Sequence, residues 1–305
     1  MKRILECRCS DLVNMTREEL LYAMAASEGR TLACETVGTL QPMLGDITNA
    51  EFVAAMGADL ILLNIFDVNN PVIRGLPKTE PENVVRKLKE LTGRPIAINL
   101  EPVEQSMGAT DPMWELSDGR KATLSNAKKA ADMGVNMVLL TGNPGIGVTN
   151  KAITDTLALY RAELGDRLVL AAGKMHAAGI LSEAAENIIT KEDVKAFREA
   201  GADIILLPAP GTVPGITQEY ATELIRYIHS LGGLAMTAVG TSQEGADTAT
   251  IRQIALMSKM AGADIHHLGD AGYGGMALPE NIQAYSIAIR GIRHTYRRMA
   301  GSVNR

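Results

Sequence analysis

The sequence predicts a single (β/α)₈ barrel, in which eight parallel strands alternate with eight helices. Three observations support this fold class: a segment that occurs four times, a second repeated segment that interleaves with it, and long loops that follow the strands. The length of 305 residues suits one large barrel domain or two ordinary domains, and 46% hydrophobic residues suffice for a large core.

The first repeat joins a Gly-Ala-Asp triplet, or a variant of it, to a short run rich in apolar residues. Its copies are residues 57–63, 134–140, 201–207 and 262–268, spaced by 77, 67 and 61 residues. Each copy follows an amphipathic stretch, so the glycine stands where the end of a helix requires the left-handed conformation. The run after it is typical of a strand buried on both faces.

The second repeat supplies the alternate strands and opens at Gly29, Gly93, Gly165 and Gly232. An open doubly wound sheet is the alternative fold, but only a closed barrel explains a repeat in quarters, because alternate strands fill alternate core layers.

The last helix is predicted at Pro279–Met299 and an extra helix near 16–27, giving an N-terminal extension (1–28) and a barrel (29–299). Strands are expected to begin near Thr31, Asp59, Pro95, Asn136, Leu168, Ala202, Leu234 and Ala263.

Long loops follow the predicted strands, at about 67–82, 101–123 and 173–191, whereas helix-to-strand links have two to four residues. Functional residues of barrels lie on such loops at the carboxyl ends of the strands, called the mouth here. Trp114 lies in the loop after the third strand, where it either covers a substrate or packs locally.

Side chains alternate along a strand, so the odd strands can be read in register. The residues of the odd strands are counted from Arg30, from Arg94 and from the equivalent position in the fifth strand. By this count, the polar residues near the strand ends lie on the same face of their strands. Each alone could be a core polar group, but two carboxylates, a lysine and a histidine together indicate an active site. The residues are Glu35, Asn99, Glu101, Lys174 and His176.

In the even strands, the same reading places Asn64, Thr141 and His267 on the inward side near the mouth. His266 is expected to face the helices as a structural histidine. Asp67 has the other parity and stands at the foot of a long loop.

The loops after strands seven and eight are rich in glycine, and barrels often bind a phosphate there through backbone N–H groups. Ordinary tight turns are the alternative, and Asp270 would repel an anion unless it points away. The predicted phosphate-binding residues are Gly240, Thr241, Ser242, Gly269, Gly272 and Gly274.

The composition and charge of the chain limit the classes of partner that it is expected to bind. A net charge of −5 and a pI near 5.6 argue against nucleic-acid binding, and the basic cluster at 290–298 is expected to form a solvated helix face. No signal peptide or membrane-length apolar stretch is recognised, and three cysteines give no disulfide framework. We therefore expect a cytoplasmic protein, and a homo-oligomer, that binds a small phosphorylated metabolite.

The barrel region resembles the phosphate-binding (β/α)₈ barrels that isomerise, epimerise or cleave sugar phosphates. The stretches 27–31, 44–50 and 66–70 are similar to a bacterial barrel family whose members are labelled haloacid-dehalogenase-like hydrolases or phosphonomutases. No strand ends in the Asp-x-Asp of the dehalogenases, and the acidic cluster of the mutases is not matched in order, so this resemblance implies the fold only.

The first functional hypothesis is an enzyme of carbohydrate metabolism, an isomerase or lyase, acting on a phosphorylated sugar or sugar acid by proton transfer next to a carbonyl or by C–C cleavage. Lys174 would act as a Schiff-base nucleophile or electrophile and pair with Glu101, the equivalent residue one odd strand earlier. Glu101 or Glu35 would shuttle the proton, and His176 would be a second acid/base. Asn64 and Asn99 would orient substrate hydroxyls.

Two alternatives remain open. A metal-dependent lyase or hydrolase would hold a divalent cation through residues such as Asp67, Glu101 and His176, although no dense ligand motif is present. A non-catalytic barrel that senses a metabolite would need the phosphate loops but neither Lys174 nor Glu101.

Overall fold

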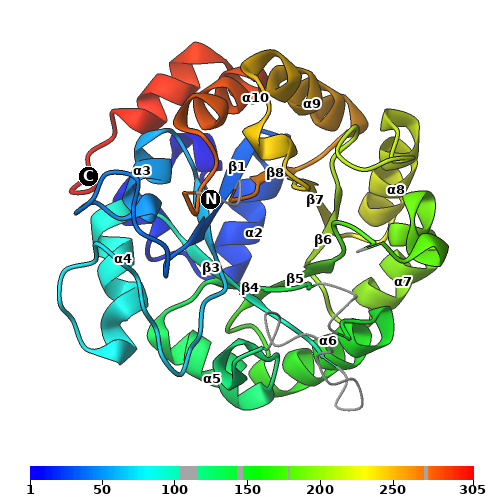
Figure 1. The fold of residues 1–305 in the computed structure, drawn as a ribbon, viewed down its shortest axis with the longest axis horizontal. Helices are drawn as coiled ribbons and strands as arrows, with labels where there is room; N and C mark the ends of the chain where they lie inside the picture. The colour runs from blue at the N-terminus through cyan, green and yellow to red at the C-terminus, as the bar shows by residue number, and fades with distance from the viewer. Residues whose placement is uncertain (104–115, 143–146, 178, 271–273) are drawn as a thin grey trace.

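The computed structural model describes residues 1–305 except 104–115, 143–146, 178 and 271–273. Eight parallel strands pair in chain order, and the first also pairs with the eighth, so the sheet closes into a barrel. Figure 1 looks along the barrel and shows the strands as an inner ring within a ring of helices. The predicted fold class is confirmed.

Every strand starts within two residues of its predicted start. The strands are β1 (Thr31–Val37), β2 (Leu60–Asn64), β3 (Ile96–Leu100), β4 (Met137–Leu140), β5 (Val169–Gly173), β6 (Ile204–Pro208), β7 (Leu234–Val239) and β8 (Ile265–Leu268). The outer helices are α3 (Asn49–Ala55), α4 (Val84–Thr92), α5 (Leu124–Met133), α6 (Asn150–Leu164), α7 (Lys191–Glu199), α8 (Gln218–Ser230), α9 (Thr248–Ala261) and α10 (Pro279–Met299). Two helices precede the barrel, α1 (Cys9–Leu12) and α2 (Arg17–Ala25). None of the helices in the described residues has the length and apolarity needed to cross a membrane.

The third residue of each Gly-Ala-Asp copy fastens its strand to the preceding one, at the amino ends of the strands. In every copy its side-chain oxygen accepts a hydrogen bond from a backbone N–H of the neighbouring odd strand. The pairs are Asp59–Leu32, Asn136–Ile96, Asp203–Leu170 and Asp264–Ala235, at 2.9, 3.1, 2.9 and 2.8 Å. The repeat in the sequence therefore preserves an inter-strand link, because a buried N–H needs an acceptor.

Helix α2 covers the barrel at the amino ends of the strands, called the bottom here (Figure 1). Its Leu20 and Met24 pack with the apolar side chains that fill the barrel interior. Arg17 ties the helix to the start of β6, since its Nε lies 3.1 Å from Oδ2 of Asp203. The barrel interior is closed at the bottom by packing, which leaves the mouth as the end from which a ligand can enter the interior.

The predicted register is correct for the first and third strands but wrong for the fifth. Ala33, Ala97 and Val169 face the interior, whereas Leu170 packs in the outer layer between sheet and helices. In β5 the inward residues therefore have odd numbers, and Lys174 has the opposite parity. The glycine that ends the preceding helix, and not the arginine that follows it, sets the register of each odd strand. Val169 stands four residues after its glycine, as Ala33 and Ala97 do.

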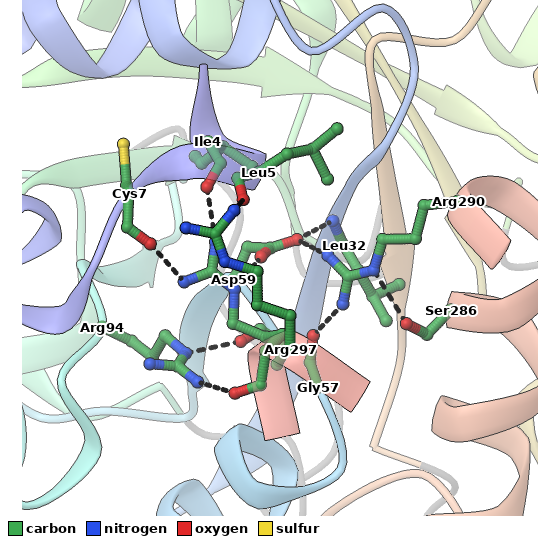
Figure 2. Close-up of polar contacts among 12 residues, drawn as sticks. Ile4, Leu5, Cys7, Leu32, Gly57, Asp59, Arg94, Ser286, Arg290 and Arg297 are labelled. Carbon is green, nitrogen blue, oxygen red and sulfur yellow. Dashed lines mark hydrogen bonds and ion pairs between the residues drawn. The ribbon is translucent and has the colours of Figure 1, made fainter. Parts of the chain in front are cut away.

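The expectation of a solvated basic face on the last helix is wrong for two of its arginines. Arg290 and Arg298 are only 6% and 8% exposed. Both pair with the fully buried carboxylate of Asp59, at 2.5 and 2.7 Å, and Figure 2 shows Arg290 reaching it from α10. Arg298 also donates to the carbonyl oxygen of Cys7, so the N-terminal segment covers this part of the helix.

Candidate active site

A cavity of about 720 Å³ lies at the mouth, on the side formed by the ends of β1, β2, β7 and β8 and by the loops after β5 and β6. Its size suits a small metabolite, and it lies where the sequence predicts the active site. The polar residues that line it are Glu35, Asn64, His176, Thr241, Glu244 and Asp270. Its apolar wall includes Met175, Leu181, Ile188, Val213 and Pro214.

A cluster centred on Glu35 forms the floor of this cavity. Asn64 donates from Nδ2 to Oε1 of Glu35 at 2.9 Å, and Nε2 of His267 lies 3.2 Å from Oε2. Nδ2 of Asn64 is also 3.4 Å from Oδ2 of Asp270. The barrel brings these groups together because β1 pairs with β2 on one side and with β8 on the other.

The environment of Glu35 favours the protonated carboxyl. The side chain is almost fully buried, and burial raises its pKa above the ordinary value; Asp270 raises the pKa further, whereas His267 opposes the shift. A carboxyl of this kind holds its proton closer to neutral pH and is suited to proton transfer. His267 is fully buried, and neither of its ring nitrogens makes a hydrogen bond within the described residues, although Nε2 lies close to Oε2 of Glu35.

The cavity contains carboxyl groups but no cationic side chain of lysine or arginine among the described residues that line it. The sequences of 104–115, 143–146, 178 and 271–273 contain neither residue type. Glu244 and Asp270 add to the negative character around Glu35. A ligand with many hydroxyl groups and little negative charge fits this electrostatic field better than a multiply charged anion.

Backbone groups after β7 could still bind one oxyanion. Gly240 and Thr241 line the cavity, and none of the described residues accepts a hydrogen bond from the N–H groups of 240–242. Thr241 and Ser242 have left-handed φ angles of 56° and 71°, a strained conformation that is concentrated at functional sites. The hydroxyl of Thr241 donates to the carbonyl of Thr212 at 2.7 Å, and Ser242 is exposed and does not line the cavity, so the backbone supplies the donors that face the cavity.

The other predicted phosphate residues contribute less. Gly269 lines the cavity, but its N–H already donates to the carbonyl of Val239 at 2.9 Å. The carbonyl of Gly274 accepts a hydrogen bond from Asn49, which ties it to α3. Gly272 lies outside the described residues.

The predicted residues on β3 and β4 lie apart from this cavity. Glu101 is buried and pairs with Arg120 at 2.5 Å; burial raises its pKa, although Arg120 opposes the shift. Asn99 and Thr141 are buried near the ends of β3 and β4, and Oδ1 of Asn99 has no partner within the described part of the chain. Trp114 lies outside the described residues.

Lys174 does not form the expected pair with Glu101. Its Nζ lies 2.8 Å from Oε2 of Glu183, in the short helix η6 (Leu181–Glu183), and Lys174 is not among the residues that line the cavity. The expectation is wrong because the shifted register in β5 directs the lysine toward the loop after that strand. His176 does reach the cavity, and burial lowers the pKa of its imidazole.

The candidate metal ligands do not converge. Oδ1 of Asp67 accepts from the backbone N–H groups of Asn69 and Asn70, at 2.7 and 3.0 Å, and so closes its own loop. Glu101 is occupied by Arg120. Within the described ranges, no three His, Cys, Asp or Glu side chains are placed to hold a metal ion. The residues Asp67, Glu101 and His176 therefore do not fit a divalent cation.

Sequence reasoning missed the role of two carboxylates that line the cavity. Glu244 is buried in η8 (Gln243–Gly245) after β7, and Asp270 directly follows Gly269 after β8. Their position after strands seven and eight predicts that these carboxylates lie at the mouth. The glycines of both loops, however, favour the interpretation that these loops supply backbone donors to an anion. The expectation for His266 is confirmed: it is fully buried, and its ring nitrogens lie 3.0 Å from the hydroxyl of Tyr285 and 3.0 Å from the carbonyl of Gly29.

Comparison with known proteins gives the family and supports the fold. The family model described as "Domain of unknown function (DUF7916)" matches residues 5–305. The search of curated protein sequences gave no match. Among solved structures, an archaeal fructose 1,6-bisphosphate aldolase is similar with a TM-score of 0.57 and 12% identity, over 90% of this chain and 98% of that one. A 2,3-dimethylmalate lyase of the PEP mutase/isocitrate lyase superfamily is similar with a TM-score of 0.50 and 15% identity, over 85% and 83%.

Proposed function

The chain belongs to the family described as "Domain of unknown function (DUF7916)", and for this member we propose an enzyme that transfers a proton next to a carbonyl group. The observation that carries the proposal is the buried group of Glu35, His267 and Asn64 in the floor of the mouth cavity. The substrate is a small polyhydroxylated carbonyl compound, a sugar or a sugar acid. The reaction is an isomerisation or a C–C cleavage.

Each residue has a role that follows from its surroundings. Glu35 exchanges the proton with the substrate, because burial raises the pKa of its carboxyl and so favours the protonated form more than in an exposed glutamate. His267 lies beside Oε2 of Glu35 and opposes the rise in its pKa, and Asn64 fixes the orientation of the carboxyl. His176, on another wall of the cavity, is the second acid/base.

One anionic group of the substrate, a carboxylate or a phosphate, would bind the backbone N–H groups of 240–242. A second anionic group on the substrate would be repelled by the acidic residues Glu244 and Asp270. The substrate proposed here therefore carries at most one phosphate or carboxylate, and the remaining polar contacts are to hydroxyl groups.

The test is solvent exchange, which detects proton transfer whatever the product of the reaction is. The protein is incubated in D₂O with a panel of aldoses, ketoses, sugar acids and their monophosphates, and deuterium next to the carbonyl is followed by NMR. Glu35→Gln should slow exchange by about 10²–10⁴-fold, the usual contribution of a positioned acid/base. Glu90→Gln, at an exposed carboxylate on α4, is the matched control and should exchange at the wild-type rate.

The alternatives give different results. A Schiff-base enzyme would lose exchange in Lys174→Met, and borohydride reduction with a keto-sugar would add mass at Lys174. A metabolite sensor would bind a compound without exchanging any proton, and Glu35→Gln would leave that binding unchanged. Because two of the structural neighbours are named as an aldolase and a lyase, the panel is also monitored for C–C cleavage.

A further inference from the structure

A second cavity lies at the bottom of the barrel, between α10, the N-terminal segment and the link before β3. Its volume is about 280 Å³, and it is lined by arginines and by His294, with no Asp or Glu among its described lining residues. The arginines are Arg8, Arg94, Arg290, Arg297, Arg298 and Arg305. Such a concentration of guanidinium groups around a small cavity needs an explanation, because like charges repel.

The protein itself supplies only part of the compensating charge. In the interior, Asp59 pairs with Arg290 and Arg298, and Figure 2 shows Arg94, Arg290 and Arg297 gathered near this carboxylate. Arg94 is 3% exposed, yet it donates to backbone carbonyls, such as that of Ala58 at 2.6 Å, and to Sγ of Cys9 at 3.3 Å. Two of the three buried guanidinium groups thus pair with Asp59, whereas Arg94 has no carboxylate partner of its own, which leaves an excess of positive charge.

Two acidic residues of the N-terminal segment act electrostatically on rim arginines, Glu6 on Arg297 and Asp11 on Arg8, but their ion pairs are with other cations. Asp11 binds Lys2 at 2.8 Å, and Glu6 binds Arg3 at 2.6 Å. Neither lines the cavity. Taking cations out of water without an anion is costly, so the excess charge favours a bound counter-anion.

His294 provides a second, independent observation. It lines the cavity, and its Nδ1 is buried without a hydrogen-bond partner among the described residues. A buried polar atom without a partner, at the wall of a cavity, is a place where a ligand atom can complete the bonding. An anion in the cavity would offer oxygen acceptors both to this ring and to the guanidinium groups.

We propose that this bottom cavity binds a phosphate-type oxyanion, either free inorganic phosphate or pyrophosphate or the phosphate end of a metabolite. Guanidinium forks match phosphate oxygens in pairs, and the small volume suits one or two phosphoryl groups rather than a whole nucleotide. Cys7 also lines the cavity, and burial raises the pKa of its thiol to about 11, so it adds no opposing charge at neutral pH. The anion joins the N-terminal segment to α10 and so stabilises the closed bottom of the barrel. This site is independent of the proposed activity at the mouth.

The test uses pyrophosphate and inorganic phosphate as probes, at constant ionic strength adjusted with chloride. Binding is followed by calorimetry and by the rise in Tm that a ligand specific for the folded state produces. The variant is Arg8→Gln with Arg297→Gln, two exposed residues of the rim whose loss should leave the fold intact. The matched control is Arg252→Gln, an exposed arginine of α9 that does not line the cavity.

The expected result is one saturable site whose Kd rises at least tenfold in the double variant and stays unchanged in Arg252→Gln. Crystals soaked in tungstate should show the heavy atom between α10 and the N-terminal segment. Equal affinity for adenosine diphosphate and pyrophosphate would identify a metabolite phosphate, and exclusion of the nucleotide would identify the free anion. The proposal is overturned if chloride raises Tm equally, if the double variant binds like wild type, or if tungstate lies only at the mouth.

Discussion

The two ends of the barrel are built on opposite principles. In the mouth cavity, carboxyl groups gather with no Lys or Arg among the described lining residues, Glu35 is held toward its protonated form, and Thr241 and Ser242 adopt a strained backbone. At the bottom, arginines gather around Asp59, and glycines occupy the left-handed positions that precede the strands. The mouth keeps polar groups available for a ligand, whereas the bottom uses its polar groups to hold strands, α10 and the N-terminal segment together.

The largest effect is expected from Asp59→Asn at the bottom. The amide can still accept the hydrogen bond from Leu32, as Asn136 does in its own repeat, but the negative charge between Arg290 and Arg298 is lost. We expect the free energy of unfolding to fall by about 3–5 kcal/mol, as for other broken buried pairs. Urea unfolding at neutral pH measures it.

The matched control for that change is Asp264→Asn. Asp264 holds the same position in the fourth repeat, but its partner His229 is 42% exposed at the side chain, so water can replace the lost charge. The loss should stay below about 1 kcal/mol. Similar losses in both variants would mean that the charge on Asp59 is not what distinguishes the bottom.

The second prediction concerns the stability of the mouth as a function of pH. Because the fold raises the pKa of Glu35 above 4.5, the folded protein binds more protons than the unfolded chain between 4.5 and the raised value. Stability contributed by protonated Glu35 is therefore present below 4.5 and is lost as the pH rises through that window, by about 1.4 kcal/mol for each pKa unit. Glu35→Gln does not titrate, so its stability relative to wild type should rise with pH. Urea unfolding across the window provides the measurement, and a difference independent of pH would contradict it.

A third prediction compares backbone strain at the two ends. Ser242→Gly at the mouth should stabilise the protein by up to about 1 kcal/mol, because left-handed strain of roughly 1–2 kcal/mol exceeds the entropy cost of glycine. Gly262→Ala, where φ is 103° at the end of α9, should destabilise it by roughly 1–2 kcal/mol. Thermal unfolding of both variants checks the signs. Destabilisation by Ser242→Gly would show that the serine hydroxyl contributes more than the strain costs.

The smallest effect is expected from Lys174→Met. Glu183, its partner, is 38% exposed at the side chain, so removing the lysine leaves no buried charge behind. The free energy of unfolding should change by less than about 1 kcal/mol, in the range of exposed pairs. A loss of several kcal/mol would indicate that a buried carboxylate, such as Glu101, depends on this lysine after all.

The sequence by itself determined the barrel and most of its elements. The Gly-Ala-Asp repeat marked the strand starts because a glycine must end each helix and an aspartate or asparagine must bind the neighbouring strand. Helix α10 has the bounds that the sequence predicts, and His266 is structural as predicted. These features are local or periodic, so they can be read from one chain.

Only the tertiary structure decided which polar residues meet. The sequence correctly placed Glu35, Asn64 and His267 on the inward side of their strands, but it also grouped Lys174 with Glu101. It likewise could not show that Arg290 and Arg298 are buried, because their partner Asp59 lies more than 200 residues away in the chain. Parity along a strand fixes the side of the sheet a residue faces, whereas the choice of partner depends on how distant segments pack in three dimensions.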